Sequence, residues 1–119
     1  MHLRQEGNMT FRTVAYYGHV TIAWQGETIA DKGTISADLV VRYWWLNRAI
    51  VQPKNNRRKG IGGQMLEMLK DEVKKQDGKA IVVTPGGYDL NAKDQYRFYE
   101  NHGFVNHLEG SLIYQLENA

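Results

Sequence analysis

The sequence predicts an α/β protein of the α+β kind, in which a mixed, mostly antiparallel central sheet is flanked by helices. From Thr10 to Val51 the chain is rich in residues that favour strands, and after Gly60 its apolar residues recur at helical spacing. A strand, a second helix and two more strands are expected to follow, and this order indicates helices packed on a sheet. With 119 residues, 42% of them hydrophobic and 24% charged, residues 1–119 are expected to form a single soluble domain.

Strand and turn signals alternate in the first half of the chain. Residues 13–24 are expected to form either one bent strand with a bulge at Gly18 or two strands, and residues 33–41 and 43–51 form further strands. The short connections favour an antiparallel meander. Trp44 and Trp45 must point to opposite faces of their strand, so one of them is expected to be exposed, which favours a homodimer interface.

Helical periodicity begins at Ile61 and continues to Gln76. Lys74 and Lys75 lie in the last turn, where cations complement the helix dipole. Asp77 and Gly78 are expected to end the helix, with Gly78 in the left-handed conformation.

The last third of the chain predicts a crossover and a hairpin. Residues 79–84 form a short apolar run typical of a buried strand in parallel pairing. A second helix is predicted from Ala92 to Asn101, capped by Asn91 and ended by Gly103. Residues 104–108 and 111–116 are expected to pair as a final hairpin.

A basic, glycine-rich stretch precedes the first predicted helix, where capping residues would be expected. The first N–H groups of a helix lack intrahelical acceptors and carry partial positive charge, so a phosphate is stabilised there. Cations and glycines at this point would add charge and allow close approach. The spacing fits neither a P-loop nor a dinucleotide fingerprint, but it fits Arg-x-x-Gly-x-Gly. A solvated basic turn is the alternative. The stretch is Arg57-Arg58-Lys59-Gly60-Ile61-Gly62-Gly63.

Two segments carry a family resemblance. "LNRAIVQPKNNRRKGIGGQML", residues 46–66, resembles the strand, turn and helix that bind acetyl-coenzyme A in the GCN5-related N-acetyltransferase (GNAT) family. The second family signature, Phe-Tyr-x-x-x-Gly-Phe, is present at residues 98–104. The resemblance covers residues 43–119 well and residues 1–42 only in general strand character. Because the family usually has two helices early in the chain and no helical period precedes Ile61, a shortened member is expected, with its acceptor side open or completed by a second subunit.

The resemblance implies a GNAT fold and roles for particular residues. Backbone N–H groups near the basic stretch would hold the pyrophosphate, and strand backbone at Ile50 and Val51 would pair with the pantetheine arm. Tyr99 would be the general acid, with a core position as the alternative. Asn91 would contact pantetheine, although its spacing is one residue off and an N-cap explains it better. The implied cofactor-binding residues are Ile50, Val51, Arg57, Arg58, Lys59, Gly60, Ile61, Gly62, Gly63 and Asn91.

A general base is not assigned by the sequence. Residues 43–51 contain no acidic side chain, and Asp38 and Glu27 are only distant candidates. His19, His102 and His107 are lone histidines, which more often have surface or packing roles. The aromatic cluster is expected to be core or interface rather than a stacking surface; its members are Tyr16, Tyr17, Trp24, Tyr43, Trp44 and Trp45.

The resemblance therefore implies an acetyl-CoA-dependent N-acetyltransferase, in which a primary amine attacks the thioester directly in a ternary complex. Without cysteine, no thiol intermediate is expected. The alternative is a catalytically silent GNAT-fold module that binds a protein or a nucleic acid. A net charge of +2 argues against a nucleic-acid partner. The chain has no long apolar run and no signal-peptide pattern, so a cytoplasmic protein without a membrane partner is expected, and no metal site is predicted.

Overall fold

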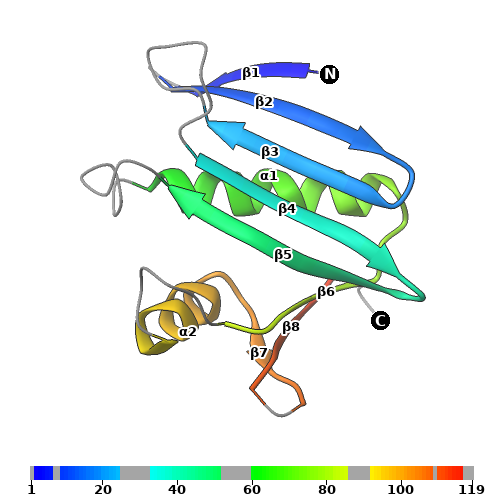
Figure 1. Ribbon diagram of the computed structural model, residues 1–119, viewed down its shortest axis with the longest axis vertical. Coiled ribbons are helices and arrows are strands. Elements are labelled where there is room, and N and C mark those ends of the chain that lie inside the picture. The colour runs from blue at the N-terminus through cyan, green and yellow to red at the C-terminus, as the bar shows by residue number, and fades with distance from the viewer. Residues whose placement is uncertain are drawn as a thin grey trace.

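A computed structural model describes residues 2–6, 9–24, 33–51, 60–85, 92–108 and 110–116 of the chain (Figure 1). Within these ranges eight strands form one sheet in the order β1-β2-β3-β4-β5-β6-β8-β7, together with two helices. The elements are β1 (His2–Glu6), β2 (Met9–Tyr16), β3 (His19–Trp24), β4 (Gly33–Val40), β5 (Tyr43–Val51), α1 (Ile61–Lys75), β6 (Ala80–Val83), α2 (Ala92–Asn101), β7 (Val105–Asn106) and β8 (Leu112–Gln115).

The first five strands form the predicted antiparallel meander. Of the two alternatives for residues 13–24, the structure has two strands, β2 and β3, joined by a turn at Tyr17 and Gly18. Gly18 has φ of 79°, a left-handed conformation that glycine adopts without steric cost. Strand β1 was not expected, because its sequence HLRQE lacks the β-branched residues that mark the strands after it.

The sheet becomes mixed at its centre. β5 and β6 pair in parallel across the α1 crossover, whereas β6, β8 and β7 pair antiparallel. The expected strand-helix-strand unit and the expected hairpin are both confirmed. The fold is therefore the predicted mixed, mostly antiparallel sheet with helices.

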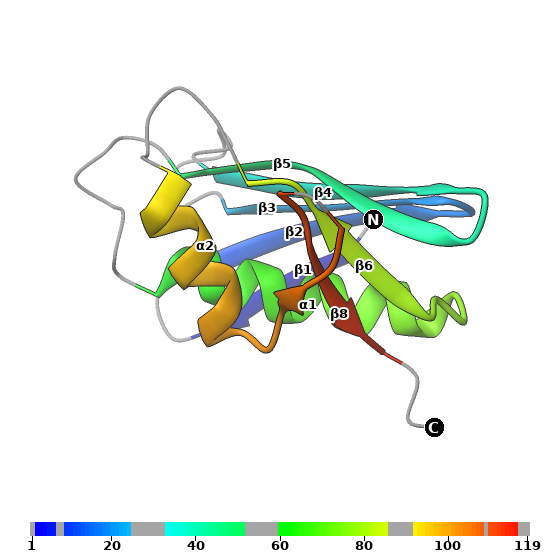
Figure 2. The same ribbon diagram turned by 90° about the horizontal axis from the view of Figure 1, so that it is seen from below.

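Both helices lie on the same face of the sheet (Figure 2). Helix α1 packs on β3, β4 and β5, and its buried side chains join those of the strands in the main core. The two neighbouring tryptophans divide between the faces as predicted: Trp44 is 1% exposed in this core, and Trp45 is 39% exposed on the opposite face. The main core includes Phe11, Ile22, Ile35, Trp44, Leu66, Leu69, Ile81 and Phe104.

The end of α1 differs from the expectation. Asp77, not Gly78, takes the left-handed conformation, with φ of 60°. Gly78 is required for another reason, because a Cβ there would overlap Val73 and the indole of Trp44. Asp77 and Gly78 end the helix, and close packing against Val73 and Trp44 is the reason that position 78 requires glycine.

Neither helix of the described ranges is both long enough and apolar enough to traverse a bilayer.

Candidate functional site

Strands β5 and β6 share only a short stretch of pairing before they separate. Their register contains two pairs, Trp44 with Ile81 and Trp45 with Val82, and past these the strands diverge (Figure 1). β5 nevertheless continues to Val51, paired with β4 on its other side. The backbone of β5 that includes Ile50 and Val51 thus follows the point of divergence.

A β-bulge in β5 lies at the point of divergence. The register with β4 passes from Ala37–Leu46 to Ser36–Arg48, which leaves Asn47 without a partner residue. A bulge bends its strand and increases the local twist. It provides a local cause for the turning of β5 away from β6.

Within the described residues, no side chain caps the N-terminus of α1. Gly60 occupies the N-cap position with φ of 81°, and its carbonyl accepts the N–H of Gln64 at 3.0 Å. The first turn carries no acidic residue. A helix start of this kind carries partial positive charge and favours an anion. Arg57, Arg58 and Lys59, which would add charge, lie outside the described residues.

The surroundings of a side chain would differ at each of the three glycines of this turn. At Gly60 a Cβ would meet nothing within 4 Å, so the positive φ is what favours glycine. A Cβ at Gly62 would touch the Phe98 ring at an ordinary 3.6 Å. At Gly63, a Cβ would lie 2.9 Å from Cε1 of His102, so any side chain there would require the imidazole to shift.

The predicted general acid, Tyr99, is in the core. It is 5% exposed, and its ring packs edge-on against Phe98 and Phe104. Burial raises the pKa of Tyr99 to about 12. The phenol therefore keeps its proton at neutral pH and is a donor rather than a base. Its core position is established, and this position is compatible with the catalytic role.

A buried lysine joins the two helices near this tyrosine. Lys70, 6% exposed, donates to the carbonyl of His102 at 2.6 Å and to Glu67 at 2.9 Å. Its ammonium lies 3.9 Å from the centroid of the Tyr114 ring. Partial burial raises the pKa of Glu67, but hydrogen bonds from Lys70 and His102 outweigh it and the net shift is downward. This cluster, which the sequence did not reveal, positions α2 against α1.

On the face away from the helices, Asp38 lies beside β5. It is the register partner of both His19 and Trp45, and Asn47 of the bulge donates to its Oδ2. His19 Nδ1 lies 2.7 Å from Asp38 Oδ1. In the sequence Asp38 is only a distant candidate and His19 a lone histidine, because only the strand register brings them next to β5.

One further candidate that the structure describes, His107, lies apart from this arrangement. His107 is exposed and meets Tyr43 edge-on at 6.2 Å between ring centroids. Glu27 and Asn91 lie outside the described residues. Among the residues that the structure describes, no His, Asp and Glu side chains are grouped so that they could hold a metal ion.

The parallel pair that diverges, the helix that crosses between its strands and the uncapped start of that helix define the acyl-CoA N-acyltransferase class of fold. Residues 16–106 match the acetyltransferase (GNAT) domain, which is about three quarters of the chain, and the protein belongs to this family of N-acetyltransferase-type enzymes. No curated protein matches the sequence.

Solved structures support the fold at low sequence identity. A GNAT family acetyltransferase from Elizabethkingia anophelis, with acetyl-CoA bound, has a TM-score of 0.71 at 13% identity; the match covers 92% of this chain and 99% of that one. PaiA N-acetyltransferase from Thermoplasma acidophilum, in complex with coenzyme A, has a TM-score of 0.64 at 16% identity; the match covers 81% of this chain and 58% of that one. The ribosomal-protein-S18-alanine N-acetyltransferase from Escherichia coli has a TM-score of 0.66 at 17% identity; the match covers 88% of this chain and 74% of that one.

Proposed function

We propose that this protein is an acetyl-CoA-dependent N-acetyltransferase that transfers the acetyl group to a primary amine by direct attack in a ternary complex. The observation that carries the proposal is the divergence of β5 from β6 next to the uncapped N-terminus of α1. Two of the structural neighbours hold coenzyme A or acetyl-CoA. The bound cofactor supplies an acyl group activated as a thioester.

The chain offers two kinds of contact to such a cofactor. The N–H groups of the first turn of α1, including Gly62 and Gly63, are donors for the pyrophosphate, and Arg57, Arg58 and Lys59 add positive charge. Backbone groups of β5 at Ile50 and Val51 are available to an amide-bearing arm in the manner of an added strand. Asn91 is retained as a further candidate for contact with that arm.

Tyr99 is assigned as the hydrogen-bond donor to the leaving sulfur, a narrower role than that of the general acid implied by the resemblance. A pKa of about 12 keeps the phenol protonated, while the reference pKa of a thiol is near 8.5. Complete transfer from phenol to a free thiolate would therefore be uphill. Tyr99 acts chiefly by a hydrogen bond that stabilises the developing negative charge on sulfur.

Cofactor binding is the primary test. Isothermal titration calorimetry with acetyl-CoA should give saturable binding to the native protein. Arg57→Glu should weaken this binding at least tenfold, because it removes a positive charge near the phosphates and places a negative charge there. Lys74→Glu, at the opposite end of α1, is the matched control and should bind as the native protein does. Absence of binding at millimolar acetyl-CoA would exclude the proposed function.

Turnover separates the enzyme from a silent binding module of the same fold. Release of free coenzyme A, followed with a thiol reagent across a panel of amines, is expected for at least one amine. Binding without release across the panel would favour the module. We place the protein in the cytoplasm, because a chain without cysteine fits a reducing compartment, and we expect a homodimer.

A further inference from the structure

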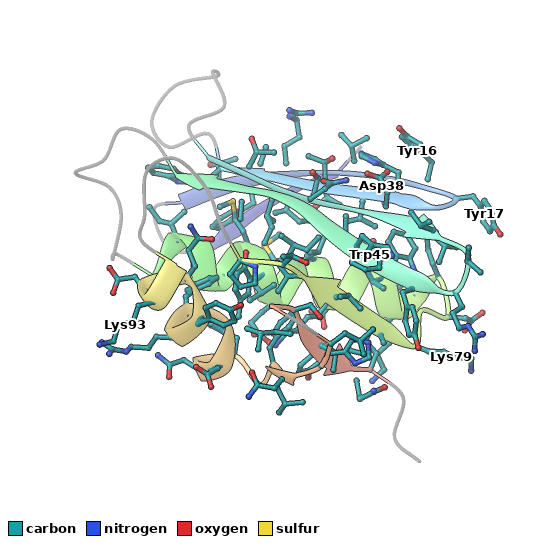
Figure 3. All side chains as sticks on the ribbon, turned by 60° about the horizontal axis from the view of Figure 1, so that its bottom comes forward. Tyr16, Tyr17, Asp38, Trp45, Lys79 and Lys93 are labelled. Atoms are coloured by element: carbon teal, nitrogen blue, oxygen red, sulfur yellow. The ribbon has the colours of Figure 1, made fainter. Side chains whose placement is uncertain are left out.

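The sheet face opposite the helices carries an ordered row of side chains. Tyr16, His19, Asp38 and Trp45 come from β2, β3, β4 and β5, and each is the register partner of the next. Within the described residues no helix covers this face of β3, β4 and β5 (Figure 2). Tyr16, Asp38 and Trp45 can be followed across the strands in Figure 3.

Hydrogen bonds fix the carboxylate of Asp38 within this row. A carboxylate only accepts, so His19 Nδ1, at 2.7 Å, must carry the proton of that bond. The other ring nitrogen of His19 lies 2.7 Å from the hydroxyl of Thr21, and the ring stacks on Tyr16 with centroids 4.8 Å apart. His19 is thereby held in one tautomer or in the protonated form, and it orients Asp38.

A second set of bonds ties Asp38 to the bulge. Asn47 donates to Asp38 Oδ2, and the carbonyl oxygen of the Asn47 side chain accepts from Ser36 at 2.8 Å. The hydrogen bond from His19 is the largest influence on the pKa of Asp38; the bond from Asn47 adds to it, and the net shift is downward. Asp38 is therefore an anion at neutral pH.

The anion retains capacity for another partner. An ionised carboxylate offers about four lone-pair positions, and the two hydrogen bonds from described side chains occupy about two of them. The side chain of Asp38 is 43% exposed. Its neighbour Trp45 is 39% exposed, so an anion and an aromatic surface lie side by side. A carboxylate next to an indole is a combination that favours an alkylammonium group, through a charge-assisted hydrogen bond and a cation–π contact.

The position of the pair relative to the diverging strands suggests what the ammonium would be. Trp45 is the last residue of β5 that pairs with β6, and Asn47, two residues on, is the bulged residue bonded to Asp38. The acyl group is proposed to lie where the strands separate, and the helices occupy one face of the sheet at this point. An attacking amine must then approach from the side of Trp45 and Asp38.

We propose that Asp38 and Trp45 form the recognition site for the acceptor, an aliphatic primary amine that binds as its ammonium ion and releases one proton to water before its nitrogen attacks the thioester. His19 and Asn47 are positioning residues that orient the carboxylate. Arylamines, which are neutral at pH 7, are excluded from the substrate class. The inference rests on the proposed function for its location, but the binding of an ammonium ion to this pair can be measured without turnover.

Tryptophan fluorescence provides that measurement. Trp24 and Trp44 are 6% and 1% exposed, so acrylamide quenching reports chiefly on Trp45. n-Butylammonium, titrated into the protein with coenzyme A present, should protect Trp45 from quenching, whereas n-butanol should not. Asp38→Asn should weaken this protection about tenfold or more, because a hydrogen bond between two charged groups is lost. Asp71→Asn, an exposed acid on α1, is the control and should behave as the native protein does.

Kinetics give a second readout. With n-butylamine as acceptor, Asp38→Asn should raise the amine KM about tenfold and leave the KM for acetyl-CoA unchanged. Equal protection of Trp45 by n-butylammonium and n-butanol, or an unchanged amine KM in Asp38→Asn, would overturn the inference. Failure to bind acetyl-CoA would instead remove the proposed function, and the fluorescence titration would still decide whether this pair binds ammonium.

Discussion

The imidazole of His102 occupies the space that a side chain at position 63 would need. Its Cε1 and Nε2 atoms lie 2.9 Å and 3.0 Å from where a Cβ of Gly63 would be, so the end of α2 rests directly on the first turn of α1. The helix start that is proposed to bind pyrophosphate and the helix that carries Tyr99 are therefore held in one fixed relation. Disturbing this contact should affect both halves of the site.

Gly63→Ala is expected to be less stable than Gly62→Ala by about 1–3 kcal/mol, because both gain helix propensity but only a methyl group at position 63 forces His102 or α2 to move. Gly62→Ala is the matched control. Its added methyl group would meet Phe98 at an ordinary 3.6 Å, and alanine favours the helix by about 1 kcal/mol. Urea unfolding measures both variants. Equal stability of the two would show that His102 yields without cost.

Tyr99→Phe should lower kcat by about 10²-fold or more while the KM for acetyl-CoA changes little, since the hydroxyl acts on charge that develops in the transition state. Because burial raises the pKa of Tyr99 to about 12, loss of its proton cannot limit activity until the pH approaches that value. Any fall in kcat of the native protein near pH 10 should therefore also be seen in Tyr99→Phe. A kcat unchanged in the phenylalanine variant would leave Tyr99 a core residue only.

The same shift predicts a loss of stability at high pH. A tyrosine ionises near pH 10 in the unfolded chain but only near 12 in the fold, so the unfolded state is favoured progressively between these values. The cost should reach roughly 2–3 kcal/mol by pH 12. Tyr99→Phe removes it, and the difference in unfolding free energy between the two proteins should change over this interval and be constant below pH 9.

Lys70→Met should destabilise the protein by about 1–3 kcal/mol, because the carbonyl of His102 and the carboxylate of Glu67 lose their common donor in a buried position. Lys74→Met, on an exposed position of the same helix, should change stability by less than about 0.5 kcal/mol. Thermal or urea unfolding distinguishes them. A stable Lys70→Met variant would indicate that packing of the methionine replaces the lost bonds.

Val41→Gly should raise stability by about 1 kcal/mol, although it replaces a larger side chain. Val41 has φ of 60° in the turn between β4 and β5, a conformation that costs a side-chain-bearing residue roughly 1–2 kcal/mol. The side chain is 92% exposed and contributes little burial in return. Val40→Gly, in the adjoining strand, should instead lower stability by about 0.5–1 kcal/mol. A loss of stability in both variants would mean that Val41 is held by contacts that offset its strain.

Regular periodicity made much of the fold predictable. The apolar residues of α1, from Ile61 to Val73, mark the helix without any tertiary information, and the run at residues 80–83 marks a strand buried on both faces. β1 lacked such a pattern, since polar residues dominate it. At the end of α1 the left-handed residue is Asp77 and not the predicted Gly78, whose role depends on close packing against Val73 and Trp44 that the sequence does not show.

The candidate site was predictable only in part. Glycines and cations before α1 form a local pattern, so the proposed anion site could be recognised in the sequence. Asp38 and Asn47 meet through the register of two strands and a bulge, and no local pattern encodes that meeting. The buried position of Lys70 likewise depends on how α2 packs on α1, since an isolated helix with this sequence would be expected to place that lysine in water.

The separation of β5 from β6 also affects solubility. Beyond its last pair with β6, strand β5 continues for six residues whose backbone groups on that side are not paired with β6, and unpaired strand edges are templates for aggregation. A ligand that binds along this edge of β5 would also protect the protein from self-association. Purified protein should accordingly remain monodisperse longer, and melt at a higher temperature, when coenzyme A is present in large excess over its dissociation constant.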